Sequence, residues 1–291
     1  MKKSLVVVNR SSGCGFSESK VRTVLASVLG SSPSPLVYPE SRADAINQTY
    51  LATLAGVEEI FVWGGDGSLN AVVHGVMSAK TEGYKSPSIR VIGGGSGSDF
   101  LRTLRSHHPR ANIAVDIGLV EIIDTGARRY FVNGLSCGVT AEIAELKNAM
   151  PRWMPGSLKY LVATCLRIFR GNLYTSTVMN EVNFPEILGI MVLNGQFVGG
   201  GMRIMTKSFA DDGQLESVIL PKLNMIDMIR AVASTYAGGL ETSLVAKVEP
   251  VAVPLKISFA TRGRFETDGE IFDARDVVVS SINKALEISY L

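Results

Sequence analysis

The sequence predicts two domains, an N-terminal α/β domain with a parallel sheet and a C-terminal, mostly antiparallel β domain. Its 291 residues are 46% hydrophobic and 19% charged, a composition that excludes disordered chains, coiled coils and small disulfide scaffolds. Short β-rich runs alternate with amphipathic helical stretches up to about residue 105, and β segments dominate beyond about residue 120. At ~100–200 residues per domain, the length also fits two domains.

Charge and cysteine content exclude several classes of function. The 29 basic and 27 acidic residues give a net charge of +2, without the basic excess that binds a phosphate backbone, so we expect no nucleic-acid partner. Cys14, Cys137 and Cys165 have no CxxC spacing, which indicates a reducing compartment and argues against structural zinc. The apolar start is too short for a secretion signal, and no uncharged stretch reaches the ~20 residues of a spanning helix. We therefore expect peripheral membrane contact at most.

In the N-terminal part, apolar runs predict strands at residues 5–8, 36–38, 59–63 and 89–92. The stretches between them predict helices, because their apolar residues recur at helical spacing, and Ser41 is the expected N-cap of the second helix. The apolar positions are Val21, Val24, Leu25, Val28, Ile46, Tyr50, Leu54, Leu69, Val72, Val73, Val76 and Met77. Repeated β-α units predict a parallel sheet, whose ligands bind at the carboxyl ends of the strands.

In the C-terminal part, strands are predicted at residues 130–132, 187–193, 215–220, 255–259 and 277–282. Strict alternation of apolar and polar residues at 255–259 is typical of a strand with one wet face. Helices are predicted around residues 158–169 and 225–232. For the helix at 158–169 we expect core packing of its apolar face. The alternative is a face that lines an acyl pocket, with Lys159, Arg167 and Arg170 near anionic headgroups.

The segment 61–70, FVWGGDGSLN, runs from a predicted strand through a glycine turn into a helix. Glycine lets the backbone approach an anion, and the amide groups that begin a helix point at it, so the turn can hold a phosphate. The alternative is a tight turn without a ligand. The segment lacks the lysine of a P-loop and is not a GxGxxG on the first strand, which weakens an oxidoreductase interpretation.

A second glycine turn, residues 93–100 (GGGSGSDF), follows the next predicted strand, and two such turns together favour a polyphosphate such as a nucleotide. Asp99 either caps the short helix to Leu104 or directs a carboxylate at an acceptor hydroxyl. Downstream, DDG at 211–213 and DGE at 268–270 are hairpin turns by default. Phosphoryl transfer also needs a hard cation and a carboxylate base, which these turns could supply.

Together these motifs resemble the diacylglycerol kinase catalytic-domain lipid kinases, which include bacterial diacylglycerol kinases, YegS-like lipid kinases and sphingosine and ceramide kinases. The resemblance covers most of the chain, in order: Asn9 with Gly13, GGDGSLN for GGDGT-x-N, GSGSDF for GTGNDF, Asp116-Ile117-Gly118 for DxG, Asn194 with Gly199-Gly200-Gly201-Met202 for N…GGGM, and then DDG and DGE. It implies an N-terminal α/β, NAD kinase-like domain and a C-terminal antiparallel β-sandwich domain, with the nucleotide cleft between them.

The resemblance also implies domain limits and site residues. Residues 1–118 would form the nucleotide-binding domain, to which residues 283–291 return, and residues 119–282 the lipid-binding sandwich. Glu270 would be the general base on the lipid hydroxyl, with Asp99 beside it at the acceptor. The ATP contacts would be Asn9, Gly64, Gly65, Asp66, Gly67, Ser68, Asn70, Gly95 and Ser96. The Mg²⁺ ligands would be Asp212 and the backbone oxygens of Phe209 and Gln214.

The sequence departs from the family pattern at several of these places. Ser68, Ser96 and Ser98 replace threonine, threonine and asparagine, and Ala71 stands where many members have glutamate. The threonine expected near residues 38–41 has no clear match, so the adenine and ribose contacts are expected to differ from the family's. Residues 206–208, TKS, replace the usual PDA directly before the predicted Mg²⁺ site. The acid at Glu270 is intact.

The hypothesis that follows is an ATP- and Mg²⁺-dependent lipid kinase acting on a diacylglycerol- or sphingoid-like hydroxyl, with a place in phospholipid metabolism. We expect a cytoplasmic protein that is peripheral to the inner face of the membrane, with a homodimer left open. Two alternatives stay open, namely an NAD kinase-like enzyme and a catalytically quiet relative that binds lipid or nucleotide. His74, His107 and His108 show no metal-ligand spacing and receive no role.

Overall fold

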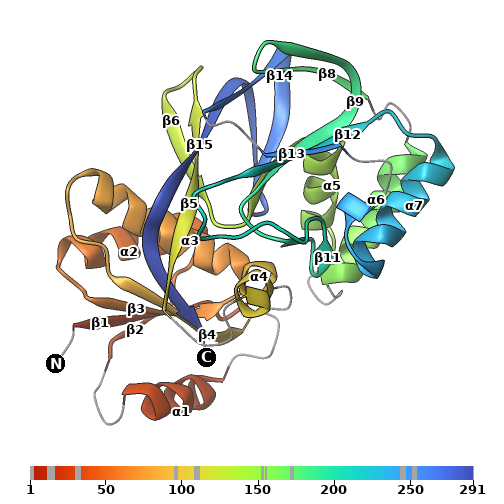
Figure 1. Ribbon diagram of the computed structural model, residues 1–291. Coiled ribbons are helices and arrows are strands. Elements are labelled where there is room, and N and C mark those ends of the chain that lie inside the picture. Colours follow the sequence, from red (N-terminus) through yellow and green to blue (C-terminus); the bar gives the residue numbers. More distant parts are fainter. Residues whose placement is uncertain are drawn as a thin grey trace. The chain divides into compact units, whose positions relative to one another are not determined.

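The computed structural model describes residues 3–11, 17–29, 34–94, 98–107, 112–151, 154, 156–170, 174–242, 247–250 and 254–290. The chain forms two compact units (Figure 1). Unit 1 comprises Met1–Ser98, His108–Val115 and Lys284–Leu291, and unit 2 comprises Asp99–His107 and Asp116–Asn283. Residues 99–107 and 116–118 thus cluster with unit 2. The assignment of nucleotide binding to the first domain and lipid binding to the second stays a prediction.

Unit 1 is built on the predicted parallel sheet. Its strands are β1 (Ser4–Val8), β2 (Leu36–Val37), β3 (Glu59–Gly64), β4 (Ser88–Gly94) and the end of β15 (Glu270–Tyr290). They lie in the order β15-β4-β3-β1-β2, and every neighbouring pair is parallel. All six residues of β3 are buried, as expected for a strand covered on both faces. The predicted fold class is confirmed for this part of the chain.

Three helices follow the first three strands of unit 1: α1 (Glu18–Leu29), α2 (Arg42–Leu54) and α3 (Asp66–Thr81). The predicted N-cap Ser41 is confirmed, since its hydroxyl accepts the amide of Asp44 at 3.1 Å. Helices α2 and α3 approach closely at Gly75, where a Cβ atom would lie 2.5 Å from the carbonyl oxygen of Ile46. This packing fixes α3, and with it the turn that precedes it.

Unit 2 is built on antiparallel strands, as predicted. The main strands lie in the order β13-β12-β9-β7-β14-β15, and several are longer than the sequence suggests. Their bounds are β7 (Gly134–Gly138), β9 (Val182–Leu193), β12 (Glu216–Pro221), β13 (Lys247–Pro250) and β14 (Leu255–Thr267). Strand β8 (Thr175–Met179) pairs with β9 and β14, β5 (Ile113–Ile122) pairs with β6 (Ala127–Phe131), and β10 (Phe197–Val198) pairs with β11 (Met202–Arg203).

The core of unit 2 is aromatic at its centre. Phe265 is fully buried, with its ring stacked on Phe272 at 5.5 Å between centroids and edge-on to Phe259 at 5.3 Å. The predicted alternation at residues 255–259 is confirmed, because Leu255, Ile257 and Phe259 are the buried positions. Aromatic pairs of this geometry add to the burial of their apolar area.

The helices of unit 2 are α4 (Asp99–His107), α5 (Val139–Asn148), α6 (Gly156–Phe169) and α7 (Met225–Ala237), with a 3₁₀ turn at Leu240–Thr242. The sequence did not predict α5, because its buried residues are mostly alanines. For α6 the expected core packing is wrong, since Leu158, Leu161 and Leu166 are 43–45% exposed. Helical spacing shows which residues share a face, but not whether that face is covered. Among the described residues, no helix is both long and apolar enough to cross a bilayer.

Phe265→Ala should lower the free energy of unfolding by about 3–5 kcal/mol, because it empties a fully buried aromatic site with two ring contacts. Urea denaturation measures the loss. Tyr84→Ala, at a side chain 45% exposed, is the control and should change stability by less than about 1 kcal/mol. Equal effects of the two substitutions would contradict the assignment of the core.

Candidate functional site

The first predicted phosphate turn joins β3 to α3. Gly65 is the N-cap residue, and its carbonyl oxygen accepts the amides of Ser68 and Leu69, each at 3.0 Å. The side-chain amide of Asn9, at the end of β1, donates to the hydroxyl of Ser68 at 2.9 Å. A Cβ atom on Gly64 would lie 2.3 Å from that hydroxyl oxygen, so only glycine fits there. Four predicted nucleotide contacts are therefore brought together at the start of a 16-residue helix, where the helix dipole favours an anion.

Two arginines that the sequence did not single out lie in the same unit. Asn70 is fully buried, and its side-chain oxygen accepts Arg42 Nη2 at 2.6 Å. The guanidinium of Arg10, the residue after Asn9, lies 4.1 Å from the ring centre of Tyr38. Arg42 directly follows Ser41, the N-cap of α2, and Arg10 lies just after β1. A basic residue at these two element ends was the sequence signal that could have identified both arginines.

The second glycine turn begins beside the first. Trp63 pairs with Gly93 and Gly64 with Gly94 across β3 and β4, so the two turns start from adjacent strand ends, as the sequence predicts. Gly95 and Ser96, the predicted nucleotide contacts of this turn, lie outside the described residues, as does Gly13. Their role stays a prediction.

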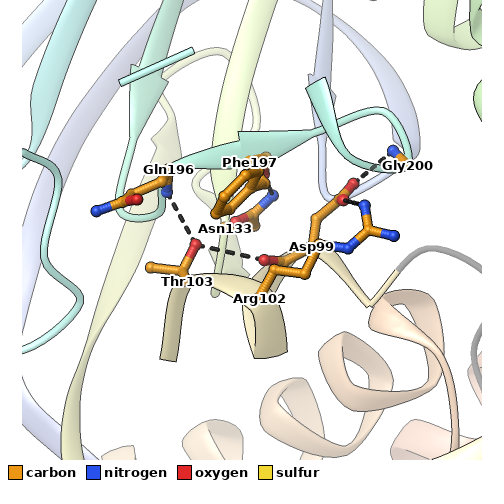
Figure 2. A network of polar contacts seen from close by, with 7 residues as sticks. All are labelled: Asp99, Arg102, Thr103, Asn133, Gln196, Phe197 and Gly200. Atoms are coloured by element: carbon orange, nitrogen blue, oxygen red, sulfur yellow. Dashed lines mark hydrogen bonds and ion pairs between the residues drawn. The ribbon is translucent and has the colours of Figure 1, made fainter. Parts of the chain in front are cut away.

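Asp99, the first residue of α4, is buried and bonded to the β10–β11 turn (Figure 2). Its Oδ2 accepts the amide of Gly200 at 2.7 Å, and its Oδ1 lies 3.3 Å from Arg102 Nη1. The Thr103 hydroxyl lies 3.3 Å from the carbonyl oxygen of Asp99 and accepts the amide of Gln196 at 2.9 Å. The side chain expected at the acceptor is thus held from two sides within unit 2.

The three glycines of that turn explain the GGGM motif. Gly199, Gly200 and Gly201 all have positive φ, at 68°, 87° and 114°, a region that L side chains rarely adopt. A Cβ atom on Gly201 would also lie 2.2 Å from Arg102 Nη1. Glycine at these positions is therefore what allows the Gly200 amide to reach Asp99.

The DGE motif forms a two-residue hairpin turn between β14 and β15. Thr267 pairs with Glu270, and Asp268 and Gly269 have φ of 46° and 95°, the left-handed pair typical of an Asp-Gly hairpin. The Asp268 carboxylate turns inward and accepts three successive backbone amides, from Val132 at 2.7 Å and from Asn133 and Gly134 at 3.0 Å each. The default interpretation as a turn is correct, and the turn also anchors the predicted base.

Two further contacts hold this hairpin. The carbonyl oxygen of Gly269 accepts Asn148 Nδ2 of α5 at 2.8 Å. The half-buried carboxylate of Glu266 accepts the amide of Gly269 and, at 2.8 Å, the hydroxyl of Ser136 on β7. Desolvation raises the pKa of the Glu266 carboxyl, and the charge of the nearby Glu270, which begins β15, acts in the same direction. The predicted base is thus placed by contacts from β7, α5 and the loop at 132–134.

Asn133 joins the two predicted catalytic carboxylates through the chain. Its amide donates to Asp268, and its side-chain Nδ2 donates to the carbonyl oxygen of Phe197 at 2.6 Å (Figure 2). Phe197 lies on β10, directly before the turn whose Gly200 amide binds Asp99. Asp99 and Glu270, 171 positions apart, therefore belong to one hydrogen-bonded framework in unit 2.

The DDG turn places Asp212 at the surface, where its Oδ1 accepts the amide of Gln214 at 2.9 Å. The buried carboxylate of Asp116 accepts the amide of Gly213 at 2.5 Å. Within the described part of the chain, no group of three or more His, Cys, Asp or Glu side chains is arranged to hold a metal ion. The predicted Mg²⁺ site at Phe209, Asp212 and Gln214 consequently has one carboxylate and depends on backbone oxygens.

Burial raises the pKa of Asp268 to about 7, although the three amide donors act in the opposite direction. Between about pH 4 and about pH 7 the folded protein therefore holds a proton at this carboxyl that the unfolded chain, with a pKa of 3.8, has released. The resulting stabilisation is complete below about pH 4 and is lost as the pH rises through about 7. Burial also raises the pKa of Glu216 to about 7, and this carboxyl likewise loses its contribution to stability as the pH rises.

Asp268→Asn should reduce the fall in stability between about pH 5 and about pH 8, because it removes one titrating group. It should also cost about 1–3 kcal/mol at the lower pH, since an amide NH₂ cannot accept a backbone N–H. Asparagine tolerates the positive φ of this turn. Urea denaturation at both pH values measures the change, with Glu287→Gln, at an exposed acid of β15, as the control. An unchanged pH profile in Asp268→Asn would contradict the raised pKa.

Two family models match the chain. The diacylglycerol kinase catalytic domain matches residues 3–127, and the YegS C-terminal NAD kinase beta sandwich-like domain matches residues 133–290. A candidate lipid kinase of Staphylococcus aureus strain JH9 is 28% identical over 171 residues, and one of strain Newman is 29% identical over the same length. Each alignment covers 56% of this chain and 54% of the relative. The chain thus spans about half the length of the curated relatives that it matches.

Solved structures show the same fold. A candidate diacylglycerol kinase from Bacillus anthracis strain Sterne superposes with a TM-score of 0.75 at 17% identity, over 99% of this chain and 95% of that one. A diacylglycerol kinase from the same strain gives a TM-score of 0.70 at 16% identity, over 99% and 96%. The β-sandwich model alone matches more than half of the chain. With its glycine turns and DGE hairpin, this chain belongs to the diacylglycerol kinase and YegS-like lipid kinase family.

Proposed function

We propose that the protein is an ATP-dependent lipid kinase, which transfers the γ-phosphoryl group of ATP to the hydroxyl of a diacylglycerol- or sphingoid-like lipid. The observation that carries this proposal is the anchored hairpin at Asp268, which fixes Glu270 in a framework shared with Asp99. Membership of the lipid kinase family supports the same reaction class. ATP, Mg²⁺ and the choice of lipid belong to the proposal.

The nucleotide contacts proposed in unit 1 gather at the start of α3. Asn9, Gly64, Gly65 and Ser68 lie together there, and Asp66, Gly67 and Asn70 belong to the first turns of the helix. Backbone amides, the helix dipole and close approach at glycine would bind the phosphate groups. Gly95 and Ser96 complete the proposed set.

The acceptor chemistry is proposed for unit 2. Glu270 takes the proton of the lipid hydroxyl as the new O–P bond forms, and ADP leaves with the electrons of the broken P–O bond. Asp99, held by Gly200 and Arg102, is proposed to orient the same hydroxyl. Mg²⁺ would neutralise phosphate charge, as such transfers require. Positioning by the hairpin and by the β10–β11 turn is the contribution of this chain's own residues.

Gly67→Ala should distinguish between two interpretations of the turn at 64–67, a phosphate-binding turn and a tight turn without a ligand. A Cβ atom at Gly67 meets nothing within 4 Å, and the position is helical, so alanine should leave the protein as stable or up to about 1 kcal/mol more stable. It should nevertheless weaken ATP binding, measured by calorimetry, because the added methyl group occupies the space of the phosphates. Gly238→Ala, which also has open space, should not change ATP affinity. Unaltered ATP binding by Gly67→Ala would favour the plain turn.

Glu270→Gln should reduce lipid phosphorylation by at least about 10²-fold, the lower range for removal of a general base, with nucleotide affinity nearly unchanged. Mass detection of products over a panel of diacylglycerol, sphingoid base, phosphatidylglycerol and monoacylglycerol measures the loss, and Glu287→Gln is the matched control. Unchanged turnover would refute the role of Glu270. An arm with ATP and NAD tests an NAD kinase-like activity, and lipid binding without ATP consumption would indicate a quiet relative.

A further inference from the structure

We propose that the outward sides of α6 and α7 form a docking surface for an anionic lipid bilayer. The choice of a bilayer rests on the proposed lipid kinase function, which it deepens by naming the surface through which the enzyme reaches its substrate. The docking surface is defined by Leu158, Leu161, Leu166, Tyr174, Met225, Ile226, Ile229 and Tyr236.

Exposed apolar side chains are concentrated there. In the part of the chain that the structure describes, twelve large hydrophobic residues are exposed, and eight of them belong to the docking surface, with exposed fractions of 38–62%. The other four are scattered: Leu51, Tyr84, Ile123 and Val182. Single exposed hydrophobics are normal on a protein surface, whereas a cluster of this size indicates a binding site.

The two helices are packed by their other sides. Met228 and Ala231 of α7 are buried in the same hydrophobic cluster against which Ile168 of α6 packs, and both helices belong to unit 2 (Figure 1). The link continues at their ends, where the Tyr174 hydroxyl donates to the carbonyl oxygen of Leu223 at 2.9 Å. The exposed residues therefore lie on sides that the unit's own core leaves uncovered.

Helical spacing puts the exposed residues in line. Leu158 and Leu161 are three positions apart on α6, as are Ile226 and Ile229 on α7, and Tyr236 follows Ile229 by seven. Residues at these spacings share one face of a helix. Each helix thus has one buried and one exposed apolar side, an arrangement suited to lying along a membrane surface.

Charge identifies the partner as anionic. Residues 146–180 contain five basic residues and no Asp or Glu: Lys147, Arg152, Lys159, Arg167 and Arg170. Arg167 is paired with Glu142, and its side chain is only 11% exposed, so Lys159 and the exposed Arg170 are the residues offered to a lipid headgroup. Over the whole chain the net charge is only +2, so the excess is local. Lys222 pairs with Glu186 at 2.9 Å and lies 5.0 Å from the ring centre of Tyr174. Basic residues beside apolar and tyrosine side chains fit the interface of a bilayer that contains anionic lipids.

Vesicle co-sedimentation tests this proposal. The wild-type protein should bind phosphatidylglycerol–phosphatidylcholine vesicles at least about tenfold more tightly than pure phosphatidylcholine vesicles, and added salt should weaken the binding. Ile226→Gln with Ile229→Gln should weaken it by about tenfold or more, because two exposed apolar side chains are lost. The matched control is Leu51→Gln with Val182→Gln, at two sites outside the docking surface that are 51% and 56% exposed, and should bind like the wild type.

A charge variant separates the two contributions. Lys159→Gln with Arg170→Gln should reduce the preference for anionic vesicles and its dependence on salt. Equal binding by the Ile226/Ile229 variant and its control would overturn the proposal. The proposal would also be overturned if sedimentation equilibrium showed that the wild type is a dimer and this variant a monomer, with vesicle binding unchanged. The docking surface would then bind a second copy of the chain and not a bilayer.

Failure of the docking surface and failure of the proposed function give different results. Glu270→Gln should bind vesicles like the wild type, because it changes no docking residue. The Ile226/Ile229 variant should keep its activity on a short-chain lipid in solution and lose activity only on vesicles. If no lipid is phosphorylated in any format, the kinase proposal fails, while the vesicle measurements still decide the docking surface.

Discussion

The rest of unit 2's candidate site depends on the hydrogen bonds of the half-buried Asp268 carboxylate. It accepts three successive amides of the loop at 132–134, and that loop leads directly into β7. One side chain thereby ties the tip of the β14–β15 hairpin to the loop that precedes β7, the strand paired with β14 on its other edge. Buried backbone amides need hydrogen-bond acceptors. The hairpin supplies the Asp268 carboxylate as acceptor, and the loop amides hold the hairpin in place. These hydrogen bonds therefore position Glu270, two residues after Asp268.

Much of the fold could be predicted from the sequence, because it follows from local pattern. Alternation at 255–259 gives the buried positions of β14, and the glycine turn after β3 starts a helix as expected. The contacts that join these elements could not be predicted. Asp268 reads as a hairpin residue, and its acceptor role depends on amides about 135 positions earlier. Asn133 belongs to no motif that the sequence singled out and is identified only by its hydrogen bonds to Asp268, Phe197 and Asn194.

In the candidate site, too, some features could be predicted from the sequence and others depend on contacts that the sequence does not show. The carboxyl ends of parallel strands lie at the same edge of a sheet, so the two glycine turns after β3 and β4 could be placed at that edge beforehand, and the structure shows that these strands are neighbours. Asn70, in contrast, is fully buried against Arg42 of the neighbouring helix, which a linear motif cannot show. For α6, periodicity identified the apolar face but gave no information on what covers it. Motifs thus predicted which residues matter, and packing determined how each of them is held.

The path of β15 has a consequence for synthesis of the protein. The strand starts in unit 2, and residues 288–290 close the sheet of unit 1 by pairing with β4. Until these residues have left the ribosome, β4 has an unpaired edge of backbone amides and carbonyls, although the other strands of that sheet precede unit 2 in the chain. An open edge invites pairing with other nascent chains. Unit 1 is consequently completed only after unit 2 has been synthesised, and chaperone protection during that interval would fall on β4.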